Sequence, residues 1–80
     1  MSGRFLGGMN PKVDARKKKA LKMLRSSLTE EKEAVRDYRH KAKMAKCKPI
    51  KKQFRELAHD ESRHVKEIKK RIRMIQRRKR

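Results

Sequence analysis

The sequence predicts an all-α fold, an antiparallel hairpin of two long helices, and three observations support this. Two stretches of the chain carry apolar residues at alternating steps of three and four, the pattern of helices that pack along a seam. Between them lies "KCKPIK", where Pro49 disfavours helical geometry in the preceding residue and so predicts a turn. No segment shows the alternating pattern expected of a strand.

The first helix is predicted over about residues 11–46. Asn10-Pro11 has the form of an N-cap followed by proline at the first helical position, and residues 1–10, which hold all three glycines, are predicted to form a flexible arm. The seam consists of Leu21, Leu24, Leu28, Glu31, Val35, Tyr38, Ala42 and Ala45. Ser27 and Glu30 have the spacing of a capping box, so a break near Ser27 is an alternative.

The second helix is predicted over about residues 50–78, after a turn at 47–49 and before a basic end at 79–80, so that the hairpin covers 11–78. Its seam consists of Ile50, Phe54, Leu57, Glu61, His64, Ile68, Ile72 and Ile75. Only 34% of the 80 residues are hydrophobic and 4% aromatic, which is too few for a full core. We therefore expect two hairpins to dimerise into a four-helix bundle, or to form a higher homo-oligomer.

Composition also limits the function classes. The single cysteine, Cys47, excludes an intrachain disulfide, and no apolar run is long enough to cross a membrane. The first ten residues lack the apolar region of a secretory signal, so we expect a cytoplasmic protein with no membrane partner. A net charge of +19 predicts attraction to a polyanion such as RNA or DNA.

The positive charge is concentrated toward both ends of the chain. The candidate nucleic-acid-binding residues are Arg16, Lys17, Lys18, Lys19, Lys69, Lys70, Arg71, Arg73, Arg77, Arg78, Lys79 and Arg80. Such clusters give salt-sensitive binding to phosphates without sequence specificity. One function class is therefore a small nucleic-acid-associated protein of a ribosome, nucleoid or virion, in which the hairpin is a scaffold.

A second class of function comes from polar residues on the seams. Glu31, Glu61 and His64 face the opposite helix, and Glu31 and His64 both lie about 24 Å from the turn at 1.5 Å per residue. Buried carboxylates need a compensating partner, and a metal ion is one. Glu56 and His59 have the same spacing as Glu61 and His64, but His59 points away from the seam. The alternatives are ion pairs of Glu61 and His64 with each other or with Arg and Lys, and Glu31 as a polar residue that sets register.

The residues around these three positions resemble a known family. "EEKEAVRDYRHKA" is similar to the first metal-binding helix of rubrerythrins and encapsulated ferritins, with Glu31, Ala34 and Tyr38 matching its pattern. "RELAHDESRHVKEI" is similar to their second metal-binding helix, with matches at Glu61 and His64. The resemblance covers roughly residues 28–70.

The resemblance implies a ferritin-like four-helix bundle with half a di-iron site in each chain. Glu31 and Glu61 of both chains would bind or bridge the irons, and each His64 would cap one of them. The implied activity is the oxidation of Fe(II) or the removal of peroxide, that of a ferroxidase or peroxidase-type oxidoreductase. Manganese or zinc would suit the same ligands. Tyr38 is either a hydrogen-bond partner of a ligand or a core aromatic residue.

Overall fold

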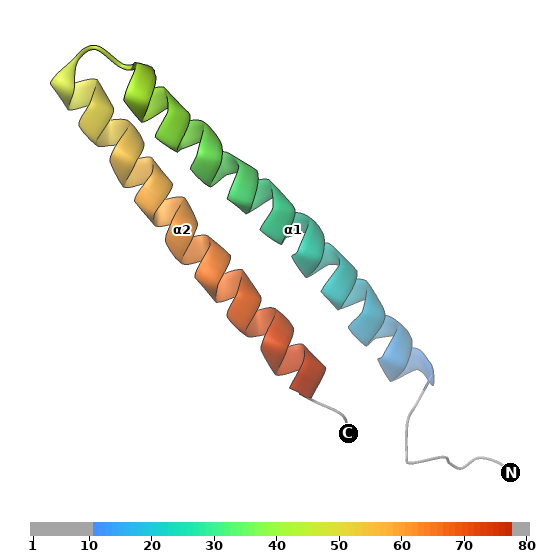
Figure 1. Ribbon diagram of the computed structural model, residues 1–80. Helices are drawn as coiled ribbons and strands as arrows, with labels where there is room; N and C mark the ends of the chain where they lie inside the picture. Colours follow the sequence, from blue (N-terminus) through green and yellow to red (C-terminus); the bar gives the residue numbers. More distant parts are fainter. Residues whose placement is uncertain (1–10, 78–80) are drawn as a thin grey trace, which may run out of the picture.

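Two antiparallel helices lie side by side along their length and are joined at one end (Figure 1). The computed structural model describes residues 11–77. Helix α1 spans Pro11–Met44 and helix α2 spans Lys48–Arg77. No strand occurs between residues 11 and 77, which confirms the predicted all-α hairpin. The predicted arm at 1–10 and the basic end at 79–80 lie outside the described residues.

Helix α1 continues through the sequence "SSLTEE" without a break. The Thr29 hydroxyl donates a hydrogen bond of 3.2 Å to the carbonyl oxygen of Arg25, four residues earlier. A hydroxyl bonded in this way is satisfied inside the helix and does not compete for a cap. Ser27 therefore lies within a continuous helix, and the alternative of a helix start at this point does not apply.

The link between the helices consists of residues 45–47, two residues earlier than the expected turn at 47–49. Lys48 begins α2, and Pro49 is its second residue. Proline is tolerated there because the first backbone N–H groups of a helix have no intrahelical partner, so the missing N–H of proline costs no hydrogen bond. The first turn of α2 closes with a 2.9 Å hydrogen bond from the Lys51 amide to the Cys47 carbonyl.

The side chain of Lys51 connects the start of α2 to the end of α1 by hydrogen bonds. Lys51 Nζ donates hydrogen bonds to the carbonyl oxygens of Ala42 and Lys43, at 2.8 and 3.3 Å. These carbonyls belong to the last turn of α1, where no later backbone amide is available to bond them. A lysine at this position thus caps one helix from the next and holds the link in place.

The core between the helices is thin. Its buried residues are Val35, Ala42, Ala58 and Ile72, with 5–9% of each residue exposed. On α1, Val35 and Ala42 belong to the predicted seam, and the rest of that seam is half-buried. A core of this size agrees with the expectation that the chain buries a stripe and not a complete interior.

Helix α2 follows most of the predicted seam: Ile72 is buried, and Phe54, Glu61, Ile68 and Ile75 are half-buried. Ile50 and Leu57 were expected to face α1, but 41% and 40% of their surfaces are exposed. Ala58, which was not assigned to the seam, is buried where Leu57 was expected, and Val65 is half-buried where His64 was expected. The apolar face of α2 is wider than a single facing helix can cover, so one edge of it is left outside the interface.

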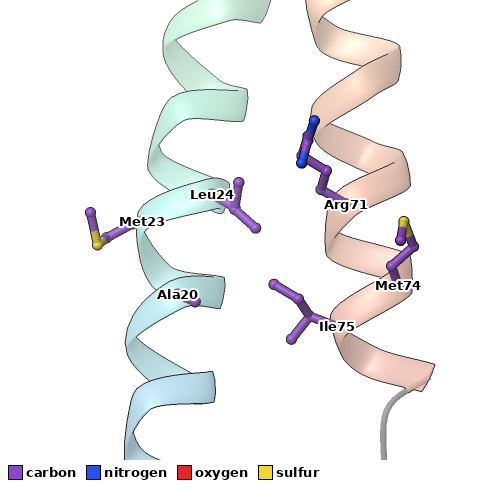
Figure 2. A pocket seen from close by; sticks show the side chains of 6 residues that line it. All are labelled: Ala20, Met23, Leu24, Arg71, Met74 and Ile75. Atoms are coloured by element: carbon purple, nitrogen blue, oxygen red, sulfur yellow. The ribbon is translucent and has the colours of Figure 1, made fainter.

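We call this uncovered face of the hairpin the open side. On α2 it carries Ile50, Leu57 and His64, which recur every seven residues and so form one stripe. Toward the end of the hairpin opposite the link, the open side widens into an apolar groove of about 440 Å³ (Figure 2). The residues that line this groove are Ala20, Met23, Leu24, Arg71, Met74 and Ile75. Leu24 and Ile75 point into the space between the helices, as Figure 2 shows.

Neither α1 nor α2, over the residues described, has an apolar stretch sufficient to span a bilayer.

Candidate metal centre

Three potential metal ligands meet midway along the hairpin. Glu31 of α1 and Glu61 and His64 of α2 each offer one ligand atom, and these atoms all lie within 4.8 Å of one another. His64 Nδ1 is 3.5 Å from Glu31 Oε2 and 3.3 Å from Glu61 Oε1. We call these three residues the carboxylate–histidine cluster. Within residues 11–77, this cluster is the group of His, Cys, Asp or Glu side chains that lie close enough together to hold a metal ion.

The fold explains why these residues meet. Glu61 and His64 are three residues apart, so they are neighbours on the same surface of α2. In a hairpin, residues at equal distances from the link lie opposite each other. Glu31 precedes the link at 45–47 by as many residues as Glu61 follows it, which brings the carboxylate of α1 to the level of the pair on α2.

The cluster lies at the border between the interface and the open side. The side chains of Glu31 and Glu61 are 29% and 20% exposed, whereas that of His64 is 58% exposed. His64 was expected to face the opposite helix. It lies instead at the rim, because α2 turns Ala58 and Val65 toward α1, yet its Nδ1 still reaches both carboxylates.

The carboxyl groups of Glu31 and Glu61 repel each other when both are charged. The pKa of Glu61 is raised above its ordinary value of 4.5, first by a hydrogen bond with the Glu31 carboxyl, then by burial and by the charge of Glu31, while His64 acts in the opposite direction. Oε2 of Glu31 is buried and has no hydrogen-bond partner among the described residues. An orphaned carboxylate oxygen facing a second carboxyl and an imidazole nitrogen is an environment that a divalent cation would satisfy.

This arrangement predicts that Glu61→Gln stabilises the metal-free protein at neutral pH. Because the folded pKa is raised, the neutral carboxyl of Glu61 contributes stability below about pH 4.5, and this contribution is lost as the pH rises through the folded pKa. The variant keeps a neutral group at every pH.

We expect the melting temperature of the Glu61→Gln variant, measured by circular dichroism with a chelator present, to exceed the wild-type value by up to about 4–8 °C at pH 7. At pH 4 the two proteins should melt within error of each other; an equal difference at both pH values would contradict the prediction.

The other residues considered for the site lie apart from it. The Tyr38 ring stacks on Phe54, with centroids 6.2 Å apart and planes at 26°, and Lys41 Nζ is 5.9 Å from its centroid. No hydrogen bond joins the Tyr38 hydroxyl to the cluster in the described part of the chain, so Tyr38 is placed as a packing residue. Glu56 and His59 are exposed and take no part in the cluster.

The basic residues predicted from the sequence lie near the start of α1 and the end of α2, which are side by side at the end of the hairpin opposite the link (Figure 1). Within the described chain, those with exposed side chains are Arg16, Lys18, Lys19, Lys69, Lys70, Arg71, Arg73 and Arg77, and Lys17 is half-buried. Two of them pair with acids four residues away on the same helix, Lys18 with Asp14 at 3.9 Å and Arg71 with Glu67 at 3.1 Å. Arg78, Lys79 and Arg80 lie outside the described residues.

Comparison with known proteins bears directly on the cluster. The family model described as Rubrerythrin matches residues 22–80, a range that includes most of α1, all of α2 and the three cluster residues. A search of curated proteins gave no match, and a search of solved structures gave none. The family match extends over well more than half of the sequence. The chain therefore belongs to the rubrerythrin family.

Proposed function

We propose that this protein binds iron at a site completed by two copies of the chain, and that the assembled site oxidises Fe(II). The observation that carries the proposal is the carboxylate–histidine cluster, whose ligand atoms lie within 4.8 Å of one another and include an orphaned carboxylate oxygen. Members of the rubrerythrin family typically bind iron, and carboxylate oxygens with imidazole nitrogen form a ligand set suited to it.

The need for a second copy follows from the number of ligands. Two irons in a four-helix bundle are held by four carboxylates and two histidines, whereas one hairpin supplies two carboxylates and one histidine. The cluster borders the open side, which also carries the exposed Ile50 and Leu57. A second hairpin docked there by a two-fold axis would cover these side chains and bring two clusters together.

Each ligand would have a distinct part in such a site. The half-buried Glu31 and Glu61 would hold and bridge the metals, and their negative charges would favour the more highly charged Fe(III) product. His64, at the rim, would present a ring nitrogen to one metal. The irons would supply one-electron redox chemistry: two Fe(II) ions lose one electron each, and hydrogen peroxide takes up two electrons and two protons to give two waters. Dioxygen is the alternative oxidant.

The experiment that tests this proposal is an iron analysis of the full-length protein after loading with Fe(II) under nitrogen. High salt during purification removes bound polyanions, which could carry iron of their own. We expect about one iron per chain, and a rise in ferric absorbance when peroxide or oxygen is added. A helical, soluble protein that retains no iron, manganese or zinc after this treatment would overturn the proposal.

A further inference from the structure

We propose that the face of the hairpin away from the carboxylate–histidine cluster binds the phosphate backbone of duplex DNA. Between the helices on this face lies a depression of about 370 Å³. Its positively charged lining residues are Lys32, Arg36 and Arg39 of α1 and Lys66 and Lys69 of α2. The floor is formed by Val35, Ser62 and Val65, so the rims alone carry charge.

The depression continues toward the link. A second hollow, of about 250 Å³, is lined by Arg39, Lys43, Lys51 and Arg55, together with Ala42. Arg39 borders both hollows and so makes them one surface, which we call the cationic groove. On α1 alone, the residues from Lys32 to Lys43 extend over about 17 Å at 1.5 Å per residue. The groove thus presents a line of positive charge along the hairpin and not a single point.

No acidic side chain lines the cationic groove. The described ion pairs all lie elsewhere: Lys41 with Asp37 at 3.0 Å and Arg71 with Glu67 at 3.1 Å are examples. None of the groove's arginines, nor Lys32, Lys43, Lys66 or Lys69, takes part in an ion pair within the described chain. The charge of the main hollow is therefore available to an anionic partner. Nearer the link, Arg55 also borders a hollow that contains Glu56 and Asp60, and Lys51 is bonded to carbonyl oxygens of α1.

The cationic groove and the cluster face in different directions. On α2, Lys66 follows His64 by two residues, which turns it by about 200° around the helix axis. On α1, Arg36 lies about 140° from Glu31 by the same geometry. The two surfaces use different residues and opposite faces, so a second hairpin on the open side would leave the groove exposed.

The form of the groove favours duplex DNA over other polyanions. Duplex DNA is stiff and carries a phosphate charge about every 1.7 Å of its axis, which suits a straight row of cations. Single strands are usually bound by stacking bases on aromatic rings. Of the described aromatic residues, Tyr38 and Phe54 stack on each other and neither lines the groove. Binding through phosphates alone would be independent of sequence.

The test compares two variants of the full-length protein that lose the same charge from different faces. The groove variant carries Lys32→Gln, Arg39→Gln, Lys66→Gln and Lys69→Gln. The matched variant carries Lys22→Gln, Lys52→Gln, Arg63→Gln and Lys70→Gln. All eight residues are exposed, each set removes three lysines and one arginine, and no residue of the second set lines the cationic groove.

Binding of a fluorescein-labelled 20-base-pair duplex is measured by anisotropy at several salt concentrations. For the groove variant we expect affinity to fall at least tenfold at 100 mM salt, and the slope of log K against log salt to decrease by about three to four. The matched variant should lose less than threefold in affinity and less than about one unit of slope. Iron content should be unchanged in both variants, which separates this proposal from the proposed metal site.

Three results would overturn the proposal. Equal losses in the two variants would show attraction to net charge without a defined surface. Tighter binding of single-stranded RNA of the same length than of the duplex would assign the groove to a different nucleic acid. Binding to vesicles containing phosphatidylserine that is stronger than binding to DNA, and that is lost in the groove variant, would make the groove a membrane-contact surface.

Discussion

Replacing Glu61 by alanine is expected to remove iron from the protein. The substitution deletes one carboxylate from each chain and therefore two from a completed site. Loss of a group that only supports a metal ligand lowers affinity about 10–100-fold, so loss of a ligand should cost at least about 100-fold. Iron content, measured by elemental analysis after Fe(II) loading, should fall from about one per chain to less than about 0.1. The oxidation of Fe(II) should fall to the rate seen without protein.

The chain offers a matched control for this experiment. Glu56 lies on the same helix, is exposed, and precedes His59 by the same three residues that separate Glu61 from His64. Glu56→Ala should therefore bind iron as the wild type does, and both variants should give the same helical circular dichroism spectrum. Equal loss of iron in Glu56→Ala and Glu61→Ala would mean that the metal is held by surface carboxylates and not by the cluster.

Leu57→Glu is expected to separate the proposed dimer and to release iron without altering any of the proposed ligands. Leu57 is 40% exposed on the open side and precedes His64 by seven residues, so a second hairpin would bury it beside the site. Burial of a leucine contributes about 1.5–3 kcal/mol, and a two-fold interface contains it twice. The dimer dissociation constant should therefore rise by about two to four orders of magnitude. Sedimentation velocity over a concentration series measures this, with iron content determined on the same samples.

Thr29→Glu is the matched control for Leu57→Glu. Thr29 is exposed on α1, and the change introduces the same charge outside the open side. It should leave both the dimer and the iron content unchanged. If Leu57→Glu became monomeric and still held one iron per chain, the metal site would lie within a single hairpin. If the wild type were monomeric at micromolar concentration while it bound iron, the two-copy site would be wrong.

The hairpin and the cluster were accessible from the sequence because two simple rules determine them. Steps of three and four residues select the face of α1 that meets a partner, and that face is buried or half-buried along its length. The position of the link then fixes which residues lie opposite each other, so Glu31 could be matched with Glu61 and His64 before their separation was known. Both rules depend on helix geometry alone and on no detail of side-chain packing.

The exposure of Ile50 and Leu57 on α2 and the presence of the cationic groove could not be predicted in the same way. An apolar stripe shows how wide a buried face is, but not how many neighbouring helices cover it. The sequence therefore could not show whether Leu57 or Ala58 is the more buried against α1. The sequence analysis assigned anion binding to the positive ends of the chain, and that assignment stays a prediction. A different signal was present: Arg25, Lys32 and Arg39 recur every seven residues and so form one cationic stripe on α1. Counting charge along the chain, without regard to helical periodicity, conceals it.

The short link imposes an order on folding. Every contact between α1 and α2 closes a loop through residues 45–47, and the loops grow steadily with distance from the link. Lys51 and Ala42 are nine residues apart, whereas Leu24 and Ile75 are separated by 51, and this difference costs about 1.5 kcal/mol more in chain entropy. The hairpin should therefore close from the link outward, as a zipper does, and reopen from its far end. Glu31 and Glu61 meet halfway along this course, so a metal bound between them would fasten the helices well before their distant ends have paired.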